Sequence, residues 1–251
     1  MGDTLRVMTL NLGHGRGSSS HQALLKRPRI KRNLEAVAGT LRQVEADVVG
    51  LQEADGPCWW SGNFDHVEYL ARHGEYPHRY RGSHRKLAQI DCGTALLSRR
   101  ALQDGISGSL WSGALRPAKG FVIAAVDVGG TLVDVVSVHV DFMTRGMRRK
   151  QLGQTATALR HRGRPIILLG DLNCTWGREH TLIELATRLD LVAFEPESRT
   201  MATFPQTRPR RRIDWILVSR GIEFSRYEVV GESLSDHCGV FAELNFSPNA
   251  G

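Results

Sequence analysis

The feature that most constrains the fold is a series of short apolar runs, rich in β-branched residues, that recurs along the chain. Each run has the length of a buried strand and is too short for an ordinary helix. Gly129 and Gly130 separate two of the runs, which predicts a two-residue hairpin turn. The runs predict strands over residues 5–10, 47–52, 93–98, 121–128, 132–139, 165–169, 213–218 and 239–244.

Amphipathic segments between some of these strands predict helices over residues 30–44, 64–72, 147–161 and 179–188, because their apolar side chains recur at helical spacing. Strands that are apolar throughout and alternate with such helices imply sheets covered by helices. A parallel doubly wound sheet is one solution. The glycine hairpin and the number of strands favour a mixed arrangement of two sheets.

The chain has 251 residues, a length near the upper end for one domain, and no repeat or low-complexity linker interrupts it. We therefore expect one domain over residues 1–246 and a frayed tail at 247–251. No apolar run approaches the roughly 20 residues that span a bilayer. No signal-peptide pattern opens the sequence, so we expect a cytoplasmic protein, with a monomer as the default.

The cysteines are far apart and form no CxxC motif, so we expect reduced thiols, and their spacing indicates no zinc site. The formal net charge is +7, and basic residues cluster at 26–32, 145–150 and 208–212. Such clusters favour an anionic partner such as nucleic acid. Solvated helix faces give the same pattern, so composition leaves both interpretations open.

Polar residues of the kinds used in catalysis recur where the apolar runs begin or end. One such residue alone is usually a solvated loop residue, but several at corresponding places indicate a site, because strand ends converge on one rim. They are Asn11, Glu53, His139, Asp171, Asn173, Asp214, Asp236 and His237.

Their chemistry suits hydrolysis of a phosphate ester. Magnesium takes one or two carboxylates besides water and substrate phosphate, and Glu53 and Asp236 could supply them. Asp171 and Asn173, two apart on an extended segment, project to the same side and could orient an attacking water. A metal ion with directed donors provides the positioning and charge stabilisation that this reaction needs.

Two histidines complete the predicted chemistry. His237 and His139 could hold or protonate phosphoryl oxygens, and Asp214 could fix the tautomer of one imidazole.

Six sequence blocks resemble, in order, the signature of the endonuclease/exonuclease/phosphatase superfamily, and they span nearly the whole chain. They are Thr9-Leu10-Asn11, Leu51-Gln52-Glu53, Ser137-Val138-His139, Gly170-Asp171-Leu172-Asn173, Arg212-Ile213-Asp214-Trp215-Ile216 and Ser235-Asp236-His237. The resemblance implies a four-layer α/β sandwich of two mixed sheets flanked by helices. It also implies a metal-dependent hydrolase of ester bonds.

The resemblance further implies magnesium or manganese at Glu53, with Asp236 and Asn11 nearby. Asp171 and Asn173 would handle the attacking water. Asp214 would pair with His237 beside the scissile phosphate, and either Asp171 or His237 would take the proton.

Because it has a histidine at position 139, the chain resembles abasic-site endonucleases less than other members of the superfamily. Those other members are deoxyribonuclease I-like enzymes, sphingomyelinases, inositol phosphatases, deadenylases and tyrosyl-DNA phosphodiesterases. The segment 139–151 is similar to small bacterial hydrolases of the superfamily.

Our first hypothesis is a nuclease or an end-processing phosphodiesterase that acts on nucleic acid. Basic side chains near the site would grip a phosphate backbone, and an indole could stack on a base. A lipid or small-molecule phosphoesterase is the alternative, and a catalytically silent binding module is the third hypothesis. The substrate-binding candidates are Trp176, Arg210, Arg211, Arg212 and His14.

Overall fold

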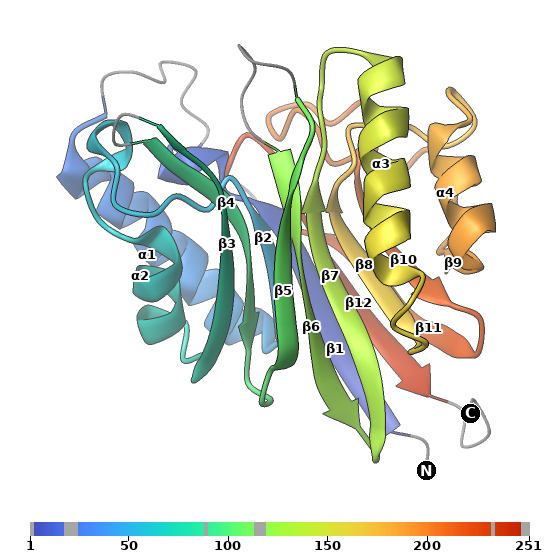
Figure 1. Cartoon of the computed structure of the whole chain (residues 1–251). Helices are drawn as coiled ribbons and strands as arrows, with labels where there is room; N and C mark the ends of the chain where they lie inside the picture. Colours follow the sequence, from blue (N-terminus) through green and yellow to red (C-terminus); the bar gives the residue numbers. More distant parts are fainter. Residues whose placement is uncertain (1–2, 18–24, 88–89, 113–118, 232–233, 247–251) are drawn as a thin grey trace.

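The computed structural model describes residues 3–17, 25–87, 90–112, 119–231 and 234–246. The predicted tail at 247–251 lies outside the described residues. In this described part of the chain, twelve strands form two six-stranded sheets, and four α-helices cover them (Figure 1).

The first sheet contains β1 (Asp3–Asn11), β2 (Val48–Gln52), β3 (His78–Leu87), β4 (Ile90–Ser98), β11 (Ile222–Val230) and β12 (Gly239–Phe246). Their spatial order is β11-β12-β1-β2-β4-β3. β1 is parallel to β2 and antiparallel to β12, so the sheet is mixed, as predicted.

The second sheet contains β5 (Gln103–Leu110), β6 (Lys119–Val128), β7 (Thr131–His139), β8 (Ile166–Asp171), β9 (Leu191–Ala193) and β10 (Asp214–Ser219). Their order is β5-β6-β7-β8-β10-β9, and this sheet is also mixed because β7 and β8 are parallel. Gly129 and Gly130 both have positive φ and form the predicted hairpin between β6 and β7.

The four helices are α1 (Arg27–Val44), α2 (His66–His73), α3 (Arg145–Leu159) and α4 (Thr181–Leu189), and two short 3₁₀ turns, η1 (Gly13–Gly15) and η2 (Trp59–Ser61), follow the first two strands. The side chains of Asp65 and Thr144 accept hydrogen bonds from backbone N–H groups in the first turns of α2 and α3. These caps satisfy donors that a helix start otherwise leaves unpaired.

Three apolar clusters separate the four layers. The first lies between the first sheet and α1 and α2, the second between the two sheets, and the third between the second sheet and α3 and α4. Figure 1 shows the two helix pairs on opposite outer faces of the molecule. The four-layer sandwich predicted from the sequence is therefore confirmed.

The two sheets come into direct contact beneath the strand ends that carry the polar residues. A side chain at Gly50 would place its Cβ 1.8 Å from Leu169, so only glycine allows this approach. Beside it, the buried Gln52 amide donates to the Ser137 hydroxyl at 3.0 Å, which in turn donates to the Leu51 carbonyl at 3.0 Å. This buried polar link fixes the relative position of the sheets below the site.

All eight predicted strands are present, and they are the eight inner strands of the two sheets. The four strands without a prediction, β3, β5, β9 and β11, are the four sheet edges. β3, β5 and β11 contain charged and polar side chains that oppose edge-to-edge association, so they lack an apolar run, and β9 is apolar but only three residues long. β5, for example, is exposed at nearly every position.

Among the described residues, none of the helices combines the length and apolar character needed to cross a bilayer.

Candidate active site

Polar residues from both sheets meet at one end of the sandwich. In the second sheet, His139, Asp171 and Asp214 are register partners on three neighbouring strands. In the first sheet, Asn11 ends β1 beside the end of β2, and Glu53 follows at once. β1 starts and β12 finishes at the opposite end of the sandwich in Figure 1. The strand-end residues predicted from the sequence therefore share one edge.

Asp171 lies at the centre of this group and is almost fully buried. The Asn11 side-chain amide and the Asn173 backbone N–H each donate to its carboxylate at 3.0 Å. Nε2 of His139 lies 3.4 Å from the same carboxylate, and Nε2 of His237 lies 3.9 Å from it. One carboxylate is thus held in place by two donors and faces two imidazoles.

Asn173 adopts a left-handed backbone conformation with φ of 47°, which turns the chain back towards Asp171. Its side-chain amide donates to the Val140 carbonyl at 3.0 Å, so the side chain is fixed against the loop that follows β7. The hydrogen bond to Val140 uses one N–H of the Asn173 side-chain amide and leaves its second N–H and its oxygen for other partners.

His237 is oriented by a buried carboxylate. Its Nδ1 lies 2.9 Å and 3.1 Å from the two oxygens of Asp214. The Thr203 hydroxyl donates to the same carboxylate at 2.6 Å and accepts from the backbone N–H groups of Ile213 and Asp214. These bonds leave Nε2 of His237 to face Asp171.

Burial and charge shift both members of the Asp171–His237 pair. Burial raises the pKa of Asp171 to about 7, and the positive charge of His237 opposes that rise while the negative charge of Asp214 adds to it. Burial alone would lower the pKa of His237, but the carboxylates of Asp214 and Asp171 outweigh it and raise the pKa to about 10. His237 therefore carries a positive charge at neutral pH.

Glu53 has positive φ, and three nitrogens surround its carboxylate. Nε2 of His14 lies 3.2 Å away, and Nζ of Lys119 and Nε2 of His139 each lie 3.9 Å away. Burial would raise the pKa of Glu53, but the positive charges of His14, Lys119 and His237 outweigh it and lower the pKa. Glu53 is thus an ionised oxygen donor at the edge of the site.

Lys119 is a site residue that the sequence analysis missed. It begins β6, is almost fully buried, and places Nζ 2.6 Å from Nε2 of His139. Burial and the Lys119 charge lower the pKa of His139 well below its usual range, so the neutral imidazole accepts a hydrogen bond from the ammonium. The predicted hairpin could have identified Lys119, because the hairpin register pairs the start of β6 with His139.

Asp236 and Asn11 lie on either side of Gly13. The Asn11 oxygen accepts from the Gly13 N–H at 3.0 Å, and a Cβ at Gly13 would lie 2.8 Å from an Asp236 carboxylate oxygen. The Ser235 hydroxyl donates to that oxygen at 3.0 Å. Asp236 is therefore next to the loop that follows β1, and ligation of a metal by Asp236 and Asn11 stays a prediction.

The predicted substrate residues have different environments. Trp176 is half-buried, with its ring centroid 5.9 Å from that of Trp215. Arg210 and Arg211 are exposed. The Arg211 guanidinium lies 4.9 Å from the Phe204 ring centroid, and the Phe204 ring lies 4.7 Å from that of His237. Arg211 is thus one aromatic ring away from a catalytic candidate.

Arg212 does not have the environment that the prediction requires. Its side chain is almost fully buried and donates to the carbonyls of Phe194 and Glu195 at 3.0 Å and 2.9 Å. Its guanidinium also lies 4.0 Å from the Trp215 ring centroid and 4.9 Å from that of Tyr227. These contacts hold the Arg212 guanidinium inside the protein, so it does not present its charge to a substrate.

His14 bridges two carboxylates. Its Nε2 faces Glu53, and its Nδ1 lies 2.9 Å and 3.1 Å from the oxygens of Asp55, a residue that the sequence analysis did not consider. Burial would lower the pKa of His14, but the charges of Glu53 and Asp55 outweigh it and raise the pKa.

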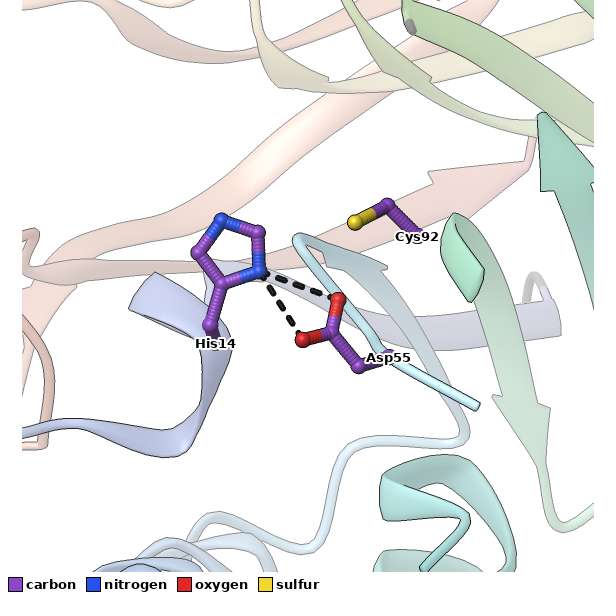
Figure 2. A group of neighbouring side chains, drawn as sticks. All are labelled: His14, Asp55 and Cys92. Carbon is purple, nitrogen blue, oxygen red and sulfur yellow. Dashed lines mark hydrogen bonds and ion pairs between the residues drawn. The ribbon is translucent and has the colours of Figure 1, made fainter. Parts of the chain in front are cut away.

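Two sets of side chains in the described part of the chain bring metal-binding atoms within 4.8 Å of one another. The first set belongs to the hydrogen-bonded group described above, and the second, drawn in Figure 2, contains the histidine whose Nε2 faces Glu53. The sets are Asp171, Asp214 and His237, and His14, Asp55 and Cys92. All four cysteines lie in the described part, and no disulfide joins them.

Comparison with known proteins identifies the family. A sequence profile of the Endonuclease/Exonuclease/phosphatase family matches residues 8–237. No curated protein matches the chain.

Solved structures share the fold. A family protein from Bacteroides thetaiotaomicron superposes with a TM-score of 0.77 at 16% identity, covering 98% of this chain and 99% of its own. A mannosyl-6-phosphatase from the same organism gives 0.71 at 16% identity, covering 96% and 100%. Truncated TDP2 from Caenorhabditis elegans gives 0.68 at 17% identity, covering 96% and 97%.

The profile match spans most of the chain and includes every strand end described above. Members of this family are phosphoesterases. The chain therefore belongs to the endonuclease/exonuclease/phosphatase family and is a hydrolase of phosphate esters.

Proposed function

We propose that the protein is a divalent-metal-dependent phosphodiesterase that acts on nucleic acid, as a nuclease or an end-processing enzyme. The observation that carries this proposal is the arrangement around Asp171. A buried carboxylate, held by Asn11 and Asn173, faces the imidazoles of His139 and His237 on the same edge as Glu53.

The residues at this edge fit a magnesium or manganese ion. Glu53 presents an ionised carboxylate, and Asp236 supplies a second one beside the loop that follows β1. Magnesium usually takes only one or two carboxylates and completes its shell with water and substrate phosphate. Glu53 would be the principal ligand, with Asp236 and Asn11 nearby. When bound, the ion would supply Lewis acidity at a phosphoryl oxygen and would orient the substrate.

Asp171 would orient the attacking water and accept its proton. Its fixed position supports this role, and a pKa near 7 suits a general base at neutral pH. Asn173 would help to direct the water with the amide atoms that its bond to Val140 leaves available.

His237 would act as a cation beside the scissile phosphate. Its bond to Asp214 holds Nε2 towards the site, and its raised pKa keeps it protonated, so it is a poor proton acceptor at neutral pH. Lys119 would balance the charge of the same phosphoryl group, and the neutral His139 imidazole beside it would contact that group. Positive groups that are already in place stabilise developing charge without reorganisation.

Nucleic acid is the preferred substrate class because of the charge around the site. The chain carries a net charge of +7, and Arg210 and Arg211 are exposed next to Phe204, whose ring contacts His237. Two arginines at this place could bind the phosphates that follow the scissile one. Trp176 adds an aromatic surface on which a base could stack.

A phosphorylated lipid or small molecule is the second candidate. Three large apolar side chains are exposed on loops that follow candidate catalytic residues: Trp59 after Glu53, and Phe142 and Met143 after His139. Exposed apolar residues beside a site favour a substrate with an apolar portion.

A substrate panel separates these candidates. The wild-type protein and the Arg210→Ala/Arg211→Ala double variant would be assayed with magnesium on plasmid DNA, short single-stranded DNA, RNA, phospholipid vesicles and a sugar phosphate. We expect the wild type to cleave a nucleic acid fastest and the double variant to lose most of that activity. Faster turnover of lipid or sugar phosphate, equal in the two proteins, would contradict the nucleic-acid assignment.

A further inference from the structure

Three side chains beside Glu53 form a group that the proposed hydrolytic mechanism does not use. His14 lies in η1 after β1, Asp55 in the loop after β2, and Cys92 near the start of β4. Figure 2 shows the imidazole, the carboxylate and the thiol converging from these three segments. Their potential ligand atoms all lie within 4.8 Å of one another.

The ligand types in this group differ from those that magnesium prefers. Magnesium takes oxygen ligands, whereas a nitrogen, a carboxylate oxygen and a sulfur together suit a borderline-soft ion such as zinc or cobalt. Asp55 is fully buried and both His14 and Cys92 are partly so. Burial of a carboxylate is costly unless a positive partner compensates it.

The geometry of the imidazole is compatible with metal ligation through Nδ1. Nδ1 and an Asp55 oxygen are 2.9 Å apart. About a tetrahedral ion, two ligand atoms at bond lengths of about 2.0–2.2 Å lie roughly 3.4 Å apart. The same two atoms could therefore bind one ion after moving apart by about half an ångström.

The other nitrogen of His14 supplies a second, independent indication. Histidine ligands of metals almost always donate their remaining N–H to a carboxylate or carbonyl, which fixes the tautomer. Nε2 of His14 lies 3.2 Å from a Glu53 oxygen, so this partner is already present.

Local charge is also compatible with a bound ion. The Arg16 guanidinium is buried, lies 4.5 Å from the Trp60 ring centroid, and is close enough to Asp55 and Cys92 to interact with them electrostatically. Binding would release to solvent the proton between Nδ1 and Asp55 and the thiol proton of Cys92. Two released protons carry the charge of one divalent ion, so the net charge beside Arg16 would not change.

We propose that His14, Asp55 and Cys92 bind a thiophilic divalent ion of the zinc class, at a site separate from the proposed magnesium site at Glu53. Water would complete the coordination. The ion would fix His14 and, through it, the Glu53 carboxylate. The proposal does not depend on which phosphate ester the enzyme hydrolyses.

Cobalt titration tests the site directly. The full-length protein, stripped of metal and kept reduced with a phosphine, would be titrated with Co²⁺ in the presence of excess Mg²⁺. We expect a thiolate-to-cobalt charge-transfer absorption that saturates at about one ion per chain and disappears when zinc is added. A wild-type titration without this absorption would overturn the proposal, with no variant needed.

Three variants locate the bound ion. Cys92→Ser should abolish the charge-transfer absorption, and Asp55→Asn should weaken cobalt binding by at least about tenfold. Cys174→Ser, a buried cysteine in the apolar cluster under α3 and α4, should keep the absorption. Persistence of the absorption in Cys92→Ser, or its loss in Cys174→Ser, would place the thiolate elsewhere and refute the site.

Glu53→Gln separates this site from the hydrolytic one. It should abolish magnesium-dependent hydrolysis and keep the cobalt absorption, because Glu53 is not a ligand of the proposed ion. If the hydrolytic proposal fails, Glu53→Gln keeps its activity while the cobalt result still stands. Loss of the absorption in a folded Glu53→Gln protein would show that cobalt had bound at the magnesium site.

Discussion

Nδ1 of His237 lies 2.9 Å from one carboxylate oxygen of Asp214 and 3.1 Å from the other. Because the Thr203 hydroxyl also donates to this carboxylate and holds it in place, this pair fixes the ring so that Nε2 faces Asp171. The relationship joins β10 to the loop before β12, and so joins the two sheets at the site.

Replacing Asp214 by asparagine should therefore lower kcat by at least about a hundredfold while the protein stays folded, because the amide cannot stabilise the imidazolium. Steady-state kinetics with a phosphodiester and circular dichroism would measure the two quantities. Thr203→Val, which removes only the support of Asp214, should cost less than Asp214→Asn. A normal kcat in Asp214→Asn would remove the pair from the mechanism.

Lys119→Gln should lower kcat by about a hundredfold, since it removes a buried positive charge beside His139 and Glu53. The matched control is Lys150→Gln, on the exposed surface of α3, which should retain wild-type rates. Equal rates in the two variants would show that Lys119 only fills space.

The arginines at 211 and 212 should respond in opposite ways. Arg211→Ala should leave the melting temperature unchanged but weaken nucleic-acid binding and reduce the slope of log affinity against log salt by about one. Arg212→Ala should destabilise the fold by about 2–3 kcal/mol, because its guanidinium donates to two carbonyls and contacts two aromatic rings. Calorimetry and binding across a salt series would distinguish them, and a stable Arg212→Ala with a reduced salt slope would reverse the assignment.

His84 should make the fold less stable in mild acid. Burial lowers its pKa to about 4, and its Nε2 accepts from the Thr94 backbone N–H at 3.2 Å. The unfolded chain, with a pKa near 6.5, binds the proton first, so stability is full above pH 6.5 and falls as the pH drops towards 4. The loss from this group should be about 2 kcal/mol between pH 7 and pH 5.

Urea unfolding of the wild type and His84→Gln at the two pH values measures this loss, because the variant lacks the titrating ring. The same pH dependence in both proteins would show that other groups cause it.

The sequence predicted the inner strands because each is buried on both faces and so reads as an apolar run. The edge strands were not predicted because they lack such a run: β3 contains Arg79 and Arg81, β5 is largely exposed, and β9 is only three residues long. The helices were found at nearly their observed bounds, since each buries one apolar face against a sheet.

The site was predictable wherever a residue sits at a strand end, as for Asp171 and His139. Lys119 looked like one of the 33 basic residues of the chain, and only the register of the β6–β7 hairpin brings it to His139. Positions 14, 55 and 92 follow no known metal-binding spacing, and the sequence analysis looked for zinc ligands only in clustered cysteines. The three side chains come together only because the loops fold next to one another.

For Arg212 the sequence predicted a substrate-binding role, but the folded structure buries the side chain. Its basic neighbours in sequence suggested an exposed segment, but its guanidinium is buried against the rings of Trp215 and Tyr227.

We propose that a metal ion and the fixed Asp171 carboxylate together hydrolyse a phosphate ester. The most direct test is hydrolysis of bis-p-nitrophenyl phosphate by the wild type and Asp171→Asn, with magnesium or manganese and with EDTA. We expect turnover by the wild type that stops in EDTA, returns with metal, and falls by orders of magnitude in a folded Asp171→Asn protein. Turnover that persists in EDTA, or that Asp171→Asn retains, would contradict it.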